Sequence, residues 1–219
     1  MSAPDITLLF LAARSGVEKA MQEMLASEVT RCKTLGDACG FVRIAEDPFR
    51  DFVPGARGFE ATLELRLDPA ARPEALAGLG ERIDGLVQRD LSAVVVGHDH
   101  EFVAGGPGPI RYQYLMRRRH DFDPARYLAH YGTVHADIGV RTPGKLGYSQ
   151  VHAALDDSRR AAEVLGFGAW QIDSVSRLWI ESPEAFLAAA GSVGQEALAD
   201  ERGFVDGANS VMFASRPLP

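Results

Sequence analysis

Histidines and tyrosines gather in one segment of the chain, Arg117–Asp137, which reads as a strand running into a capped helix. His135 lies beside a stripe of predicted core positions on that helix, namely Tyr127, Tyr131, Val134 and Ile138. His130 lies on the opposite edge. A histidine at a helix edge can reach into a cleft, and because it titrates near neutral pH it can take and return a proton. A half-exposed histidine that is hydrogen-bonded to a neighbour is the structural alternative.

The strand that follows, Gly147–Ala154, carries a second polar group. Tyr148, Gln150 and His152 share one face because successive strand residues alternate between faces. The other face carries small residues, which suit the side beneath the helices. We therefore expect the polar face to line the interior of a barrel, where three hydrogen-bonding side chains indicate a ligand pocket. A polar face exposed at a sheet edge is the alternative.

The pair His98 and His100 is the sharpest metal candidate, because two histidines on one strand face could form two legs of a zinc or iron site. No third ligand can be identified from spacing, so we expect neither a metal nor a cofactor. The sequence contains no nucleophile elbow, phosphate-binding glycine loop or dinucleotide fingerprint.

The composition of the chain excludes some partners. Its 219 residues are 46% hydrophobic and 24% charged, with a formal net charge of −7, which argues against nucleic acid. Cys32 and Cys39 match no disulfide framework or metal motif, so we expect reduced thiols in a cytoplasmic protein. The apolar run Ile6–Ala13 is too short for a membrane span and indicates a buried strand. We expect no membrane partner.

The chain reads as two halves of the same order, 1–104 and 110–219, joined by a Gly/Pro linker at 105–109. Each half reads strand, helix, strand, strand, helix, strand. The first half is divided as Ile6–Arg14, Val17–Leu35, Ala38–Glu46, Gly58–Leu67, Arg72–Gln88 and Ser92–Val103. The second is divided as Ile110–His120, Asp123–Val140, Gly147–Ala154, Trp170–Glu181, Pro183–Asp200 and Val205–Ser215.

The order βαββαβ is the ferredoxin-like motif, so we expect an α+β fold of two such repeats. The two sheets would pack face to face as an intramolecular barrel, which leaves homodimerisation open but not required. Ala61, Leu63, Leu65 and Leu67 alternate with Thr62, Glu64 and Arg66, and we assign the apolar set to the helix side. Glu64 and Arg66 would then need partners. Asp123-Pro124 and Ser182-Pro183 predict capped helix starts, and Gly191 and Gly194 predict a break.

Several motifs of the second half resemble the EthD-like branch of the dimeric α+β barrel proteins. The motifs that carry the resemblance are Arg117 to Arg119, Tyr127, His135-Ala136, Pro143-Gly144, Tyr148, Trp179, Ser182 to Glu184 and Phe204 to Asp206. The predicted helix Val17–Leu35 has no histidine and no tyrosine follows in the next strand, so the first half looks like a scaffold copy.

The resemblance implies a single site in the second half. Its expected catalytic residues are His135, Tyr148 and His152, and its expected ligand-binding residues are Tyr131, Arg117, Gln150 and Trp179. The expected partner is a small apolar or aromatic molecule of xenobiotic or polyketide metabolism. The function would be cofactor-free proton transfer of the isomerase, dehydratase or cyclase type. Alternatives are a non-catalytic binding or accessory protein, a cofactor-free monooxygenase, and a haem protein with His135, His130, His98 or His100 as axial ligand.

Overall fold

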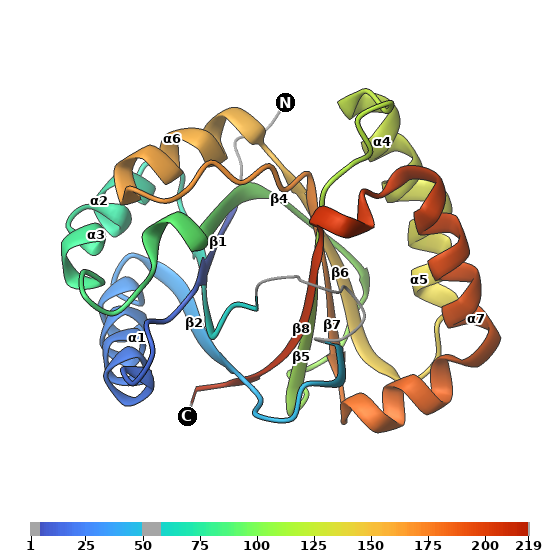
Figure 1. The fold of residues 1–219 in the computed structure, drawn as a ribbon, viewed down its shortest axis with the longest axis horizontal. Coiled ribbons are helices and arrows are strands. Elements are labelled where there is room, and N and C mark those ends of the chain that lie inside the picture. Colours follow the sequence, from blue (N-terminus) through green and yellow to red (C-terminus); the bar gives the residue numbers. More distant parts are fainter. Residues whose placement is uncertain (1–4, 50–57, 219) are drawn as a thin grey trace.

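A computed structural model describes residues 5–49 and 58–218, so the outer limits predicted for the two repeats, residues 1 and 219, lie outside it. Within that part of the chain, eight antiparallel strands close into a barrel in the order β1-β3-β2-β8-β5-β7-β6-β4 (Figure 1). The strands are β1 Ile6–Leu11, β2 Gly36–Arg43, β3 Ala61–Leu67, β4 Ala93–Val103, β5 Ile110–Met116, β6 Lys145–Ala153, β7 Ser174–Ile180 and β8 Val211–Pro217.

The helices form two layers outside this barrel, α1, α2, α3 and α6 on one side and α4, α5 and α7 on the other (Figure 1). Their bounds are α1 Glu18–Cys32, α2 Arg72–Leu76, α3 Leu79–Arg82, α4 Pro124–His130, α5 Ala136–Arg141, α6 Leu155–Leu165 and α7 Pro183–Phe204. A π-helical turn, η3 Tyr131–His135, joins α4 to α5, and the 3-10 turns η2 Arg89–Leu91 and η4 Gly207–Asn209 precede β4 and β8. None of the helices described is long and apolar enough to cross a membrane.

The predicted pair of ferredoxin-like repeats is confirmed. The first half pairs its strands as β4-β1-β3-β2 and the second as β8-β5-β7-β6, so the two halves have the same strand order. Their edges also pair, β4 with β6 and β2 with β8, and this closes the sheet around one lumen. The second half contains one helix that the sequence reading omitted, α6, which packs against β4.

The alternation on β3 divides its side chains as predicted. Leu63 and Leu65 are buried with Met21 and Leu25 of α1, on the helix side. The polar set points into the lumen, where an eight-stranded barrel is just wide enough to be filled by side chains. Part of the lumen is apolar, and its core includes Ile6, Leu8, Phe10, Phe59, Val151, Val175 and Phe213.

A buried ionic network fills another part of the lumen. Arg177 is 1% exposed, and its guanidinium lies 2.9 Å from Glu64 and pairs with Asp99. Arg66 and Arg111 also pair with Glu64, at 3.3 and 3.5 Å. Burial raises the pKa of the Glu64 carboxyl, but the three arginines outweigh that effect and the net pKa is lowered. The partners that the sequence required for Glu64 and Arg66 are therefore present.

The predicted facing of β6 is wrong. Its small residues face the lumen, where Ser149 accepts a hydrogen bond from Arg177 at 2.9 Å and Val151 joins the apolar core. Tyr148, Gln150 and His152 face the helices instead. The long Arg177 side chain needs a small neighbour inside the barrel, whereas the space between sheet and helices accommodates large rings.

The helix that carries the histidines departs from α-helical spacing at η3. A π-turn advances by one residue more than an α-turn, so His135 takes the place predicted for Val134 on the buried stripe, whereas Ile138 is buried as predicted. Val134, expected in the core, is 50% exposed, whereas His135 is 5% exposed. The rings of Tyr127, Tyr131 and His135 stack in succession, with centroids 5.9 and 5.7 Å apart. His135 therefore lies on the buried stripe rather than beside it.

The predicted helix caps are confirmed. The Asp123 carboxylate accepts the backbone N–H of Arg126 at 2.9 Å, and the Ser182 hydroxyl accepts that of Ala185 at 3.1 Å. Gly191 interrupts α7 with φ 48° and ψ −128°, a conformation that favours glycine, whereas Gly194 continues the helix.

Candidate functional site

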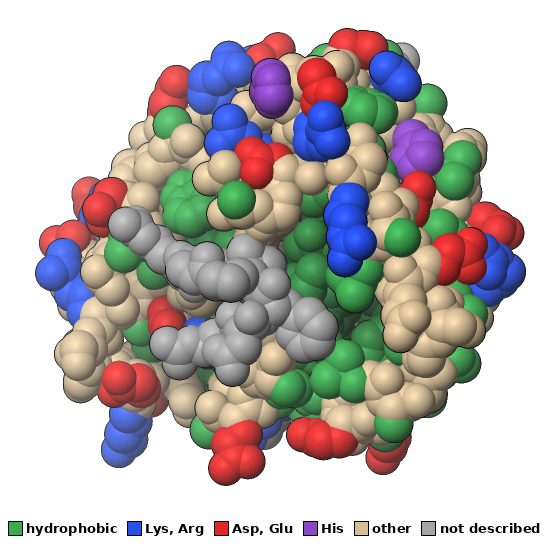
Figure 2. All heavy atoms as spheres, turned by 45° about the vertical axis from the view of Figure 1, so that its right-hand side comes forward, with side chains coloured by type: hydrophobic (Ala, Val, Ile, Leu, Met, Phe, Trp, Pro, Cys, Tyr) green, Lys and Arg blue, Asp and Glu red, His purple; other side chains and the backbone are tan. Residues whose placement is uncertain are grey.

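A cavity of about 330 Å³ lies between the outer face of the second-half sheet and helices α5 and α7. This volume is within the range of small-molecule sites. Figure 2 shows hydrophobic side chains gathered in a hollow near the middle of this face. The lining residues are mostly apolar or aromatic and include Phe49, Tyr112, Tyr114, His135, Gly139, Thr142, Tyr148, Ser176, Leu178, Phe186, Leu187, Ala190, Gln195, Leu198, Glu201 and Met212. We call this space the inner cavity.

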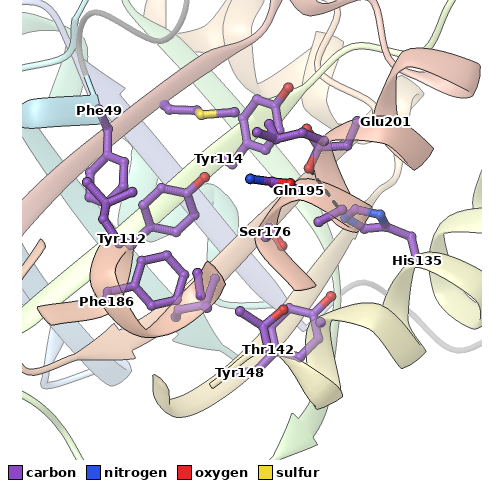
Figure 3. Close-up of a pocket in the computed structure, with 18 of the residues that line it drawn as sticks. Phe49, Tyr112, Tyr114, His135, Thr142, Tyr148, Ser176, Phe186, Gln195 and Glu201 are labelled. Carbon is purple, nitrogen blue, oxygen red and sulfur yellow. Dashed lines mark ion pairs between the residues drawn. The ribbon is translucent and has the colours of Figure 1, made fainter. Parts of the chain in front are cut away.

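One end of the inner cavity is aromatic. Phe49, Tyr112 and Phe186 surround it, with ring centroids 4.7 to 6.3 Å apart (Figure 3). Burial raises the pKa of the Tyr112 hydroxyl well above its usual value, so this ring stays neutral. Such a wall suits the face or edge of a flat aromatic ligand.

The opposite end is polar, and His135 is its centre. Its Nδ1 lies 3.0 Å from Oδ2 of Asp200. Its Nε2 lies 3.7 Å from Oε1 of Glu201, a contact that Figure 3 marks with a dashed line. Both carboxyls come from the last turns of α7, packed against η3. Phe204 closes the site from behind, with its ring centroid 5.3 Å from that of His135. The π-turn makes this meeting possible because it turns His135 toward α7.

The hydrogen bond to Asp200 fixes the tautomer of neutral His135. Burial raises the pKa of Asp200, but hydrogen bonds from His135 and His130 outweigh that effect and lower it. Asp200 is therefore ionised and can only accept, so Nδ1 of His135 must carry the proton. Nε2 of the neutral ring is then left with a lone pair on the side of Glu201, where a general base would need it.

Glu201 has the opposite protonation preference from its neighbour. Burial, and to a smaller extent the charge of Asp200, raises the pKa of Glu201 to about 8. At neutral pH this carboxyl is therefore protonated in most molecules. The polar end thus combines a base, His135, with a neutral acid, Glu201, at the wall of one cavity. Pairs of titratable groups with opposite preferences are typical of acid–base sites.

Glu201→Gln should remove a component of the pH dependence of stability. The unfolded carboxyl has a pKa of about 4.3, so between about pH 4.5 and 8 only the folded chain keeps this proton. Stability therefore falls as pH rises through this window, by at most about 1.4 kcal/mol per pH unit, and glutamine cannot titrate. Urea unfolding across the window measures the difference. The control is Glu196→Gln at an exposed position of α7, which should keep the parental slope. Equal slopes for Glu201→Gln and the parent would contradict a buried neutral carboxyl.

Tyr148 supplies a hydrogen-bond donor to the inner cavity. The Gln150 amide donates from Nε2 to the backbone oxygen of Tyr131 at 3.1 Å and to the Tyr148 hydroxyl at 2.5 Å. The Tyr148 oxygen is thus an acceptor for Gln150, and its own proton remains for Ser176 or a ligand. Burial, against hydrogen bonds to Gln150 and Ser176, raises the pKa of Tyr148 to about 12. Gly139 leaves room for the ring, since a Cβ there would lie 2.5 Å from it.

The structure brings some of the expected site residues together and separates others. His135 and Tyr148 line the inner cavity, while Tyr131 and Gln150 form a buried layer behind it. His152 donates to Gln150 at 3.1 Å but does not line the cavity, and burial, with His100 and His98, lowers its pKa to about 4.

Arg117 and Trp179, expected to bind ligand, lie away from the inner cavity. Arg117 is a half-exposed residue 3.9 Å from Asp206. Trp179 faces the lumen, where its ring stacks on Arg111 at 4.0 Å. His98 and His100 lie on the outer face of β4, paired in register with His152 and Gln150. Within residues 5–49 and 58–218, no cluster of three or more His, Cys, Asp or Glu side chains is placed to hold a metal.

Asp200 and Glu201 are the site residues that sequence reasoning missed. Their signal is a pair of adjacent acidic residues near the end of a helix rich in alanine and glycine. That signal is weak because acidic residues on helices mostly face solvent.

The candidate site lies within a range that matches a known family. Residues 119–208 match the family model described as "EthD domain", a range that contains His135, Tyr148, Asp200 and Glu201. None of the curated proteins matches the chain in sequence. Similar solved structures include an anthrone oxidase-like protein, with 10% identity, a TM-score of 0.62, and coverage of 100% of this chain and 92% of that one.

Two further structures share the fold at similar identity. One is a heme-binding protein from Thermus thermophilus, with 14% identity, a TM-score of 0.56, and coverage of 100% of this chain and 92% of that one. The other is a variant of chlorite dismutase from Candidatus Nitrospira defluvii, with 10% identity, a TM-score of 0.55, and coverage of 99% and 93%. At these identities the likeness shows a common α+β barrel.

Proposed function

We propose, from the match of residues 119–208 to the EthD domain model and from the geometry of the inner cavity, that the protein is a cofactor-free proton-transfer enzyme for a neutral aromatic carbonyl compound. The observation that carries the proposal is the pairing of His135 with neutral Glu201 at the polar end of an otherwise apolar cavity. Isomerase, dehydratase and cyclase reactions all begin with such a transfer.

The roles of the side chains follow from their protonation states. His135 Nε2 takes a proton from carbon next to a carbonyl, the electron pair of the broken C–H bond forms the C=C bond of an enolate, and the π pair of the carbonyl moves to its oxygen. The Tyr148 and Glu201 hydroxyls are donors that stabilise the negative oxygen. His135 then returns the proton to a second carbon, which completes an isomerisation, or to a leaving hydroxyl, which completes a dehydration. Asp200 holds the imidazole and stabilises its charged form.

The lining also indicates the charge of the ligand. Among the described residues that line the inner cavity, none is lysine or arginine, so a carboxylate or phosphate on the ligand would find no cation among them. Desolvating an unpaired charge is costly. We therefore expect a neutral aromatic ketone to bind at least about tenfold more tightly than its carboxylate analogue.

A hydrogen-exchange assay tests the proposal without knowledge of the product. Aromatic ketones with acidic C–H groups are incubated with the protein in D₂O, and proton NMR follows the loss of the signal next to the carbonyl. The protein should accelerate exchange for neutral ketones that bind in the cavity and not for their carboxylate analogues. Binding of the ketones without any accelerated exchange would contradict an enzyme and favour a binding or accessory protein.

Haem is a second candidate, because one similar structure is a heme-binding protein. The inner cavity does not fit it. Glu201 lies 3.7 Å from the only imidazole nitrogen of His135 that could serve as axial ligand. No lysine or arginine among the described lining residues could pair with the propionates. The donor set therefore favours cofactor-free chemistry in this cavity.

A further inference from the structure

A second depression lies where α4 and η3 meet the last turns of α7, and we call it the outer hollow. Its volume is about 440 Å³, and it is lined by Phe122, Arg126, Ala129, His130, Thr133, Asp200, Gly203 and Phe204. Asp200 thus contributes to the wall of this hollow while its carboxylate reaches His135 of the inner cavity. Asp200 therefore connects His130 of the outer hollow with His135 of the inner cavity.

Asp200 is shared between two histidines. Its Oδ1 lies 2.8 Å from Nε2 of His130, and its Oδ2 lies 3.0 Å from Nδ1 of His135. The two histidines are five residues apart, one π-helical turn, so both face α7. His130 has 30% of its side chain exposed, whereas His135 has 7%. His130 can therefore exchange protons with solvent directly, whereas the buried His135 exchanges them less freely.

We propose that His130 is a positioning residue that sets the proton affinity of His135 through Asp200. Ionised Asp200 accepts a hydrogen bond from each ring. When His130 takes a proton from solvent, its positive charge compensates the Asp200 carboxylate and weakens the stabilisation that Asp200 gives to protonated His135. The surface histidine thus makes the buried base weaker as the pH falls.

The charged groups around both rings are few. His135 faces Asp200 and Glu201 from α7, and its remaining neighbours are the rings of Tyr131 and Phe204. His130 faces Asp200 and the Phe204 ring, whose centroid lies 4.6 Å from its own, and Arg126 lines the same hollow. Glu201 is mostly neutral below its pKa of about 8, so Asp200 is the principal charge that both histidines share.

His130→Gln separates the charge from the hydrogen bond. The glutamine amide can still donate to Asp200 but cannot become positive. NMR titration of the His135 ring in the full chain should show a proton affinity about threefold to tenfold higher than in the parent. His120→Gln, an exposed histidine before α4, is the control and should leave the affinity unchanged. An unchanged affinity in folded His130→Gln would overturn the proposal. His130→Asn carries the same test if the glutamine variant does not fold.

A double variant tests the route of the coupling. Asp200→Asn should lower the proton affinity of His135 at least about tenfold, since the carboxylate charge is lost. With the charge gone, adding His130→Gln should change little, so the two effects should not be additive. Full additivity would mean that His130 acts on His135 without Asp200, and that also overturns the proposal.

The catalytic meaning of this coupling rests on the proposed proton transfer by His135, but its measurement needs no substrate. If NMR shows the coupling and no carbon acid is turned over, the proposed function fails and the inference stands. If turnover depends on His135 but His130→Gln leaves the His135 titration unchanged, the proposed function stands and the inference about His130 fails. If the proposed function and the inference both hold, the acid limb of the kcat/KM profile should move to higher pH in His130→Gln. The reason is that the pH dependence of kcat/KM reports the protonation of groups in the free enzyme.

Discussion

Replacing His135 by glutamine should lower turnover of a neutral aromatic carbonyl substrate by about 10²–10⁴-fold, with a much smaller change in binding. Glutamine keeps a donor toward Asp200 but offers no basic nitrogen toward the inner cavity. The aromatic end of the cavity, formed by Phe49, Tyr112 and Phe186, is unchanged by the substitution. Initial rates and a separate ligand titration, measured on the same preparation, give the two quantities.

His98→Gln is the matched control for that experiment, because it removes a histidine from the outer face of β4 in the other half. It should leave both turnover and affinity close to those of the parent. Equal losses of turnover and binding in both variants would identify His135 as a structural histidine. A loss of binding alone in His135→Gln would favour a binding protein.

Arg177→Met should reduce the free energy of unfolding by about 3–5 kcal/mol, the usual cost of removing one partner from a buried ion pair. Arg177 is 1% exposed and pairs with both Glu64 and Asp99 in the lumen. Methionine fills part of the volume but leaves two carboxylates short of a cation. The midpoint of urea unfolding, with its slope, measures the loss.

Arg141→Met is the control, since Arg141 pairs with Glu196 and Asp137 at the surface. Exposed pairs contribute about 0–1 kcal/mol, so this variant should unfold close to the parent. Similar losses in both variants would show that the lumen network contributes no more than a surface pair. The fold itself, which is held by the apolar cores on either side of the sheet, should remain in Arg177→Met.

The architecture can be predicted from the sequence because it depends on the period of the hydrophobic residues and on the residues that begin and end helices. The alternation on β3, the caps at Asp123 and Ser182 and the break at Gly191 are local signals, and each is seen in the structure. Helix α6 was missed although Gly166 marks its end, in the left-handed conformation. The ferredoxin-like motif βαββαβ has no helix between its second and third strands, so a prediction based on that motif places a loop there.

The candidate site was only partly predictable. A period of two shows which residues of β6 share a face but not which face turns inward, because in this barrel both faces are covered. The large side chain of Arg177, on the neighbouring strand, determines which face of β6 points into the lumen. This is a contact between residues far apart in the sequence. The π-turn before His135 gives no sequence signal in the helical period, yet it rotates His135 toward α7. Asp200 and Glu201 then acquire their roles only from that rotation.

The interruption of α7 at Gly191 divides the wall that this helix gives to the inner cavity. Residues 183–190 carry Phe186, Leu187 and Ala190, whereas the piece after the break carries Leu198 together with Asp200 and Glu201. No continuous helical ladder ties one piece to the other. Under the proposed function, substitutions or small tilts of the first piece should therefore change which compounds bind, while Asp200 and Glu201 keep their alignment with His135. The range of ligands can then change without a change in the groups that are proposed to move the proton.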